Sequence, residues 1–147
     1  MISGEFADSR PFVFASVIIP TVGRNGTIRY AGTEVAFLID TGADVTILKP
    51  SDYETLLDLR LAEAATADQG SGLGGSVSMR RASGFLYFNH DDGRWSALQV
   101  DYHIPEPLLG QEPPPFALLG RDVWGRGRLI VDLPAEHITL DLPTFGQ

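Results

Sequence analysis

The chain has 147 residues, of which 44% are hydrophobic and 20% charged, and its formal net charge at pH 7 is -8. This length and composition are typical of one folded domain, and the acidic balance argues against a nucleic-acid-binding protein, because such proteins carry basic surfaces that displace counterions from phosphates. The sequence contains no cysteine, which excludes disulfides, thiolate metal sites and a cysteine nucleophile.

The start of the chain, MISGEFADSRPF, shows no features of a targeting segment. It has no basic region leading into an apolar stretch, and no apolar run in the sequence approaches the ~18 residues of a membrane span. We therefore expect no membrane segment, and this favours a cytoplasmic location. Residues 1–11 are expected to be an N-terminal extension, part of it vector-derived, and residues 12–147 a single domain.

Strand patterns dominate the first third of the chain. The apolar, β-branched run at 12–19 predicts a strand that ends at Pro20, and Asn25-Gly26 predicts a type I′ turn, because both central residues of that turn need positive φ. Apolar residues on both faces of 35–39 predict a strand that is covered on both sides. The strands predicted in this part of the chain lie at 12–19, 27–30, 35–39 and 45–48.

Further along the chain the pattern becomes helical for a short stretch and then returns to strands. Ser51 and Glu54 have the spacing of a capping box, which predicts a short helix over 52–59 that residues 61–68 would prolong. Five of the ten prolines fall within 104–115 and predict an extended loop. The later strands are predicted within 77–88 and at 95–102, 129–133 and 138–142, with turns at 90–93 and 134–136.

Asp40 interrupts the apolar segment FLIDTGADVTIL at 37–48. A carboxylate at the end of a buried strand costs several kcal/mol of desolvation unless it is hydrogen-bonded or partly hydrated, so this position is unfavourable for a merely structural residue. Gly42 permits a tight turn with backbone N–H groups directed at the carboxylate, and Thr41 supplies a hydroxyl. The alternative is an Asx-type turn in which Asp40 only closes the strand, and the tripeptide alone supports that alternative.

Three motifs, in order along the chain, resemble those of retropepsin-like aspartic proteases. FLIDTGADVTIL resembles their active-site loop, GSGLGGSV at 70–77 their glycine-rich flap, and LLGRDVW at 118–124 the segment that begins their late helix. The resemblance covers roughly residues 12–142. It implies a mostly β, retropepsin-like acid protease barrel with one or two short helices and a β-hairpin flap, active as a two-fold homodimer.

The resemblance also implies roles for particular residues. Asp40 would be the catalytic residue. The active-site loop and substrate contacts would involve Thr41, Gly42, Ala43 and Asp44. The flap would contain Gly72, Leu73, Gly74 and Gly75. Structural support would come from Gly120, Arg121 and Asp122, with Arg121 in an internal ion pair with Asp44; the alternative is that both charges are separately solvated.

A single Asp-Thr-Gly has a direct consequence for assembly. Aspartic proteolysis needs two carboxylates about 3 Å apart that share a proton, so that one acts as base toward water and the other as acid toward the peptide carbonyl. The sequence holds one such motif, so we expect a homodimer with one Asp40 from each subunit. The expected function is an aspartic endopeptidase that hydrolyses an extended polypeptide substrate, with no metal or organic cofactor.

The sequence leaves two other functions as alternatives. One alternative is a catalytically silent retropepsin-like domain for peptide binding or dimerisation, and another is a β-barrel that binds a small ligand. The glycines at 70–75 also satisfy the dinucleotide pattern GxGxxG, but the strand-like sequence that follows them excludes that reading, which needs a helix there. The three histidines lack the spacing of a metal site, and Trp95 and Trp124 are expected in the core.

Overall fold

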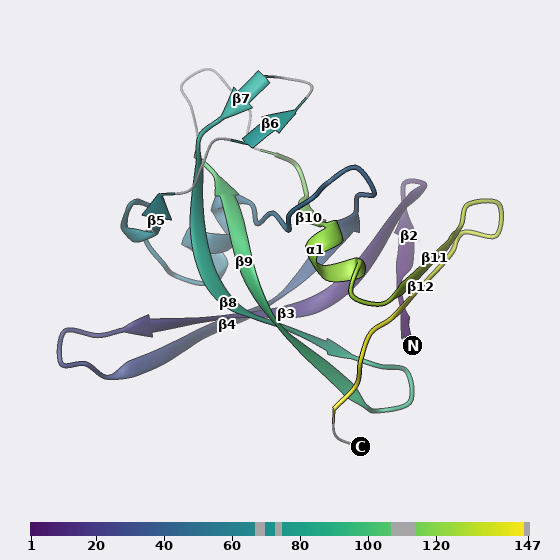
Figure 1. Cartoon of the computed structure of the whole chain (residues 1–147), viewed down its shortest axis with the longest axis horizontal. Helices are drawn as coiled ribbons and strands as arrows, with labels where there is room; N and C mark the ends of the chain where they lie inside the picture. The colour runs from purple at the N-terminus through teal and green to yellow at the C-terminus, as the bar shows by residue number, and fades with distance from the viewer. Residues whose placement is uncertain (67–69, 73–74, 107–113, 146–147) are drawn as a thin grey trace.

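The computed structural model of the chain describes residues 1–66, 70–72, 75–106 and 114–145. Strands dominate it and the helical segments are short, which confirms the mostly β prediction. Long antiparallel strands curl around one core, and the shorter elements cover its ends (Figure 1). No helix in the described part of the chain is long and apolar enough to cross a membrane.

One curled sheet carries most of the chain. Its strands follow the order β10-β4-β3-β8-β5, β2 pairs with β3, and β9 pairs with β8. All neighbours are antiparallel except β10, which runs parallel to β4. The strands of this sheet are β2 (Glu5–Ala7), β3 (Arg10–Val22), β4 (Ile28–Ile39), β5 (Ala65–Thr66), β8 (Met79–Asn89), β9 (Trp95–Pro105) and β10 (Ala117–Leu119).

Two smaller sheets complete the fold. In the first, β12 (His137–Asp141) lies between β1 (Ile2–Ser3) and β11 (Arg128–Asp132), so residues 1–11, expected as an extension, contribute strands to both this sheet and the large one. Ile2 is buried against the core. The second small sheet is the hairpin of β6 (Gly70–Gly72) and β7 (Gly75–Val77).

The core is built from alternate residues of the long strands. In β3 the side chains of Val13, Val17 and Ile19 point inward, because successive residues of a strand face opposite sides of the sheet. Phe37 and Tyr102 are fully buried, and burying each such side chain contributes about 1.5–3 kcal/mol. The predicted core tryptophans are only partly buried: Trp95 stacks on Tyr87, and Trp124 packs against the edge of the core.

The β3–β4 hairpin differs from the prediction in two respects, the end of strand β3 and the type of the turn that follows it. β3 continues past Pro20 to Val22, because β8 pairs with β3 only over residues 16–18 and a strand with one neighbour tolerates proline. The hairpin turn is closed by the Gly26 N–H, which donates to the carbonyl of Gly23, so Arg24 and Asn25 are the central residues. Within this turn only Gly26 has positive φ, and the predicted type I′ turn at Asn25-Gly26 is therefore wrong.

The prediction for residues 27–48 needs three further changes. The strands expected at 27–30 and 35–39 form one continuous strand, β4, whose burial alternates. Val35, Phe37 and Ile39 are buried while Ala36 is exposed, so this strand is not covered on both sides in the single chain. Residues 45–48 make isolated bridges through Ile47 rather than a strand.

The predicted helix at 52–59 is shorter and differently capped. A π-helical turn, η1, spans Asp52–Leu56, and a 3₁₀ turn, η2, spans Leu61–Glu63. Ser51 makes no side-chain capping bond because its own backbone is already helical, so the capping box is not formed. The expected prolongation over 61–68 is interrupted by strand β5, and residues 67 and 68 lie outside the described part of the chain.

Candidate active site

Asp40 lies directly after β4, at the point where this strand runs beside β10. Ile39 pairs with Leu119, and the Asp40 N–H donates to the Leu119 carbonyl at 3.4 Å. Asp40 is partly buried as a residue, and one of its carboxylate oxygens, Oδ1, accepts a hydrogen bond of 2.9 Å from the Gly42 N–H. A tight turn, with the Ala43 N–H bonded to the Asp40 carbonyl, fixes this arrangement.

The turn that carries Asp40 is held from behind by the start of the late helix, α1 (Arg121–Trp124). The backbone N–H of Arg121 donates to the carbonyl of Ala43, and that of Asp122 donates to the carbonyl of Asp44. These bonds use amide groups of the first helical turn, which have no partner within a helix. The predicted junction between the LLG segment and a helix is confirmed, and it contacts the Asp40 loop directly.

Gly120 is required where α1 meets this loop. A Cβ atom at this position would lie 2.4 Å from the carbonyl carbon and oxygen of Val45, closer than real Cβ contacts allow. Only glycine therefore lets the two backbones approach to this distance. The prediction that Gly120 supports the loop has a steric basis in this contact.

A side-chain network below the loop was not predicted from the sequence. Thr46 is fully buried, and its Oγ1 donates to Asp122 Oδ1 at 2.8 Å while accepting from the Gly120 N–H at 3.2 Å. The Thr46 N–H donates to the second carboxylate oxygen of Asp122, also at 3.2 Å. Asp122 is thus the acidic residue that ties α1 to the loop. The available signal was a lone threonine within the apolar stretch 45–48, where a buried hydroxyl needs partners.

The predicted pairing of Arg121 with Asp44 is present, but it is not internal. An Arg121 guanidinium nitrogen contacts Asp44 Oδ1, while the two side chains remain 65% and 76% exposed. An ion pair with this exposure contributes about 0–1 kcal/mol to the stability of a single chain. The hydrogen bonds between the buried Thr46 and the partly buried Asp122, rather than this pair, hold the loop within the chain.

The predicted flap residues fall on and around the β6–β7 hairpin. Gly72 and Gly75 are opposite each other in the pairing of β6 with β7, which confirms a hairpin at this position. Leu73 and Gly74, predicted at its tip, lie outside the described residues.

The described residues hold no group of three or more His, Asp or Glu side chains that could bind a metal ion. The Asp40 loop presents one carboxylate, which is oriented by the backbone. The Gly42 N–H orients the carboxylate through its hydrogen bond to Oδ1, and Thr41 and Gly42 are exposed next to it.

A family model described as aspartyl protease matches residues 26–123, about two thirds of the chain, including the Asp40 loop and the start of α1. Among solved structures, the chain is similar to the EIAV protease complexed with the inhibitor HBY-793, with 19% sequence identity, a TM-score of 0.47, and coverage of 80% of this chain and 88% of that one. No curated protein matches the sequence. By its family match, the chain belongs to the aspartyl proteases, of the retropepsin-like kind that its three motifs predicted.

Proposed function

We propose that the protein is an aspartic endopeptidase that works as a two-fold homodimer. One Asp40 from each subunit would lie at the dimer axis, and the two carboxylates would share one proton. A water molecule held between them would attack the peptide carbonyl, with one carboxylate taking a proton from the water and the other giving its proton to the carbonyl oxygen. No metal or organic cofactor takes part in this mechanism.

The proposal rests mainly on the burial and hydrogen bonding of Asp40. Asp40 is partly buried at the end of a core strand, and the Gly42 N–H orients one of its carboxylate oxygens. A structural turn residue would not require the further support given by Gly120, Thr46 and Asp122. The sequence holds a single Asp-Thr-Gly, so the second carboxylate has to come from another copy of the chain.

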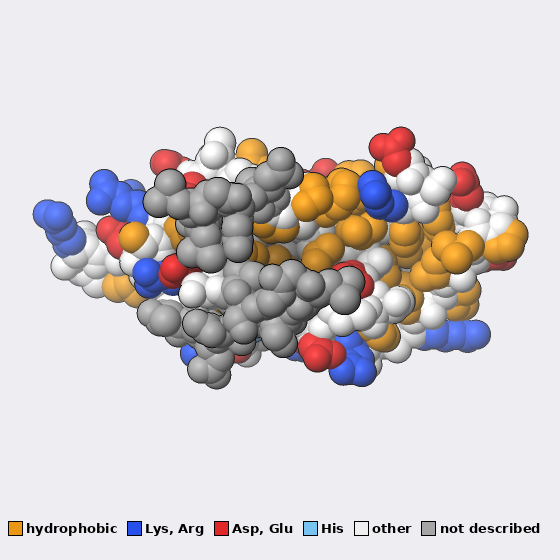
Figure 2. Space-filling model, turned by 90° about the horizontal axis from the view of Figure 1, so that it is seen from above, with side chains coloured by type: hydrophobic (Ala, Val, Ile, Leu, Met, Phe, Trp, Pro, Cys, Tyr) orange, Lys and Arg blue, Asp and Glu red, His pale blue; other side chains and the backbone are white. Residues whose placement is uncertain are grey.

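Exposed apolar surface near the chain termini supports association of two chains. Strand β11 pairs only with β12 among the described strands, which leaves an open sheet edge, and Ile130 and Leu133 are 41% and 64% exposed. Figure 2 views the molecule from above and shows hydrophobic side chains gathered toward the end where Figure 1 places β11 and β12. A flat edge with exposed apolar side chains favours pairing with another chain.

The flap and the neighbouring loop residues have defined roles in this proposal. The β6–β7 hairpin would close over an extended polypeptide and exclude water, and its strands would add main-chain hydrogen bonds to the substrate. Thr41 of each subunit would link the two loops, and the Gly42 carbonyl would bind the substrate backbone. Both residues are exposed in the single chain, as residues that contact a partner or substrate must be.

Replacing Asp40 with Asn tests the proposal. The amide keeps the size of the carboxylate but cannot exchange the shared proton, so cleavage of a peptide library should disappear while the melting temperature is retained. The aspartic protease inhibitor pepstatin should suppress cleavage by the wild type. Substantial cleavage by Asp40→Asn would contradict the proposal, and binding of peptides without any cleavage by the wild type would favour the catalytically silent alternative.

Mixed dimers and dilution test the shared site. Dimers of one wild-type and one Asp40→Asn chain should be nearly inactive, because one carboxylate cannot act as both acid and base. Activity per chain should fall when the protein is diluted below its dimer dissociation constant. A constant activity per chain through that range would rule out a site built from two subunits.

A further inference from the structure

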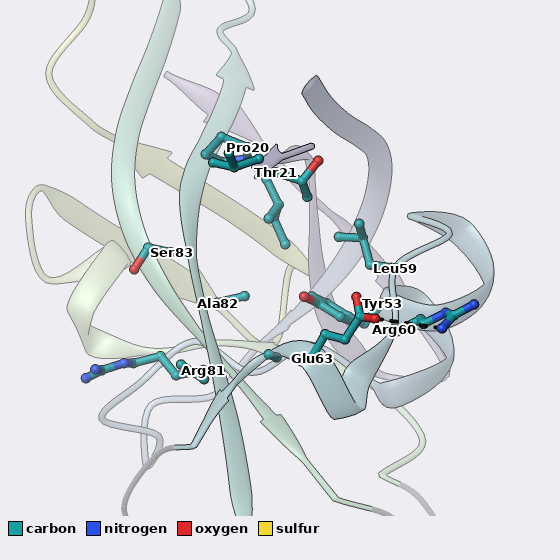
Figure 3. Close-up of a pocket in the computed structure, with 13 residues that line it drawn as sticks. Pro20, Thr21, Tyr53, Leu59, Arg60, Glu63, Arg81, Ala82 and Ser83 are labelled. Carbon is teal, nitrogen blue, oxygen red and sulfur yellow. Dashed lines mark ion pairs between the residues drawn. The ribbon is translucent and has the colours of Figure 1, made fainter. Parts of the chain in front are cut away.

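Arg80 interrupts the apolar row on the inner face of β8. Successive residues of a strand face opposite sides, and Ala82 and Leu86 are buried on the inner side of this strand. Arg80 lies on the same side, two residues before Ala82. The alternation can be followed in Figure 3, where Ala82 points toward Tyr53 and Arg81 points away from it. An arginine therefore occupies a position that the strand pattern assigns to a core side chain.

Glu106 is the partner of this arginine. The Glu106 N–H continues the β8–β9 ladder by one further bond, donating to the Ser78 carbonyl at 2.8 Å. Ser78 and Arg80 face the same side of β8, so Glu106 is the diagonal cross-strand neighbour of Arg80. The Arg80 Nε contacts a carboxylate oxygen of Glu106, and the two side chains are only 27% and 30% exposed. Water screens this pair less than it screens an ion pair on the open surface.

The Arg80 guanidinium also reaches the segment that precedes strand β5. Its Nη1 donates to the carbonyl of Ala64 at 3.2 Å, and Ala64 is the residue directly before this strand. Strand β5 itself pairs with β8, with Thr66 opposite Arg80. One side chain thus joins the segment before β5, strand β8 and, through Glu106, the end of β9.

These contacts lie at the base of the β6–β7 hairpin. The chain runs from β5 into β6 and returns from β7 through Ser78 into β8, so Arg80 lies where the two legs of the hairpin meet the large sheet (Figure 1). Among the described strands, β6 and β7 pair only with each other. The orientation of the hairpin relative to the large sheet is therefore set by the contacts at its base.

Stability alone does not explain an ion pair at this place. Removing two charges from water costs about as much as their attraction returns, and apolar residues of similar volume often stabilise a fold equally well. An apolar pair lacks direction, however. The planar guanidinium of Arg80 has a carboxylate and a carbonyl as partners, so it fixes the positions of three segments relative to one another.

We propose that Arg80 is a positioning residue, which with Glu106 holds the β6–β7 hairpin in the orientation that binds the main chain of the substrate. This role presupposes the proposed function, in which the hairpin closes over an extended polypeptide. Hydrogen bonds from the hairpin to the substrate main chain would be made in both the bound substrate and the transition state. Their loss therefore raises KM and leaves kcat nearly unchanged.

The test compares two variants with a matched control, using the best-cleaved peptide of a library as substrate. Glu106→Gln keeps the shape of the side chain without its charge, and Arg80→Met with Glu106→Leu makes the pair apolar. Both should raise KM at least about threefold, the effect of weakening one hydrogen bond, while kcat stays within about twofold. The melting temperature of the apolar variant should stay close to that of the wild type. Glu63→Gln is the control, because it removes the exposed pair with Arg60 drawn in Figure 3, and KM should not change.

Hydrogen exchange tests the same contacts without cleavage. In the Asp40→Asn background, both variants should speed amide exchange in β5, β6 and β7 at least about threefold, while the amides of Leu86 and Phe88 exchange as before. An equal increase at Leu86 and Phe88 would indicate a merely structural role and overturn the proposal. If the apolar variant does not fold, Glu106→Gln alone decides.

The two measurements separate this role from the proposed function. Cleavage by the wild type with an unchanged KM in Glu106→Gln would overturn the positioning role and leave the proposed function intact, as would a fall in kcat at constant KM. Absence of cleavage by the wild type would contradict the proposed function. Unchanged exchange in β5, β6 and β7 would then show that Arg80 does not hold the hairpin.

Discussion

The hydrogen-bond network of Thr46 and Asp122 should hold the Asp40 loop in place, and removing it should destabilise the whole chain. Asp122→Ala deletes the acceptor of two bonds, one of 2.8 Å from the Thr46 hydroxyl and one of 3.2 Å from its N–H. Hydrogen bonds to charged groups contribute about 1.5–3 kcal/mol each, and the two bonds share one partner and are not additive. Thr46 is fully buried, so the change leaves a buried hydroxyl and a buried N–H without the carboxylate that accepts from both. We therefore expect the free energy of unfolding to fall by about 2–4 kcal/mol.

Urea unfolding of four variants measures this network. Thr46→Val keeps the shape of the side chain but loses its bonds to Asp122 and Gly120, and should cost about 2–3 kcal/mol. The double variant should cost less than the sum of the two single changes, because each removes the same interaction. Asp101→Ala is the matched control, since Asp101 also accepts from a serine hydroxyl, at 2.6 Å, but is exposed. It should cost less than about 1 kcal/mol.

An Asp122→Ala chain whose free energy of unfolding lies within about 0.5 kcal/mol of the wild type, the range of an ordinary surface substitution, would contradict a stabilising role for these bonds. Full additivity of Asp122→Ala and Thr46→Val would also contradict it, since the two side chains would then stabilise the fold independently.

Three further changes test other parts of the same fold. Gly120→Ala should lower the free energy of unfolding by about 2–3 kcal/mol, because its Cβ would lie 2.4 Å from the Val45 backbone; a normal melting temperature would show that the helix can shift. Arg121→Ala should change the stability of the dilute chain by no more than about 1 kcal/mol, measured by the same unfolding assay, since its pair with Asp44 is exposed. Burial lowers the pKa of His90 below its usual 6.5, so the unfolded chain binds a proton at a higher pH than the folded chain does. The contribution of His90 to stability should therefore be complete above pH 6.5 and decline below it. His90→Gln should remove that part of the pH dependence of the melting temperature.

Most strands could be predicted from the sequence because apolar residues either alternate with polar ones or follow one another over many positions. The sequence predicted local details less well, because these depend on backbone geometry that several residue types can adopt. Asn25-Gly26 was compatible with a type I′ turn, yet the turn uses Arg24 and Asn25 at its centre and only Gly26 at positive φ. Ser51 had capping spacing, yet its own backbone is already helical and its side chain makes no capping bond. In both cases the element was predicted and its exact end was not.

At the candidate site, the loop and its glycines were predictable, whereas the supporting side chains were only partly so. The pairing of Arg121 with Asp44 was expected from the resemblance, but its exposure depends on what covers the loop and cannot be derived from residue types. Thr46 and Asp122 are 76 residues apart. The two residues are in contact only because β10 lies parallel to β4 and therefore places α1 beside the Asp40 loop. A polar residue within an apolar run indicates that a partner exists, without identifying it.

The contacts around Asp40 divide into two groups that should affect different equilibria. Bonds from α1 to the loop and the buried Thr46 network lie within one chain, so they set the position of Asp40 before any association. Thr41, Gly42 and the pair of Arg121 with Asp44 are exposed, and they contribute little until another surface covers them. In the proposed homodimer, the first group would therefore determine the free energy of unfolding at every protein concentration. The second group would act through association, because covering an ion pair removes water from it and strengthens the attraction between its charges. Changes to Asp122 and to Arg121, neighbours in sequence, should then separate folding from assembly.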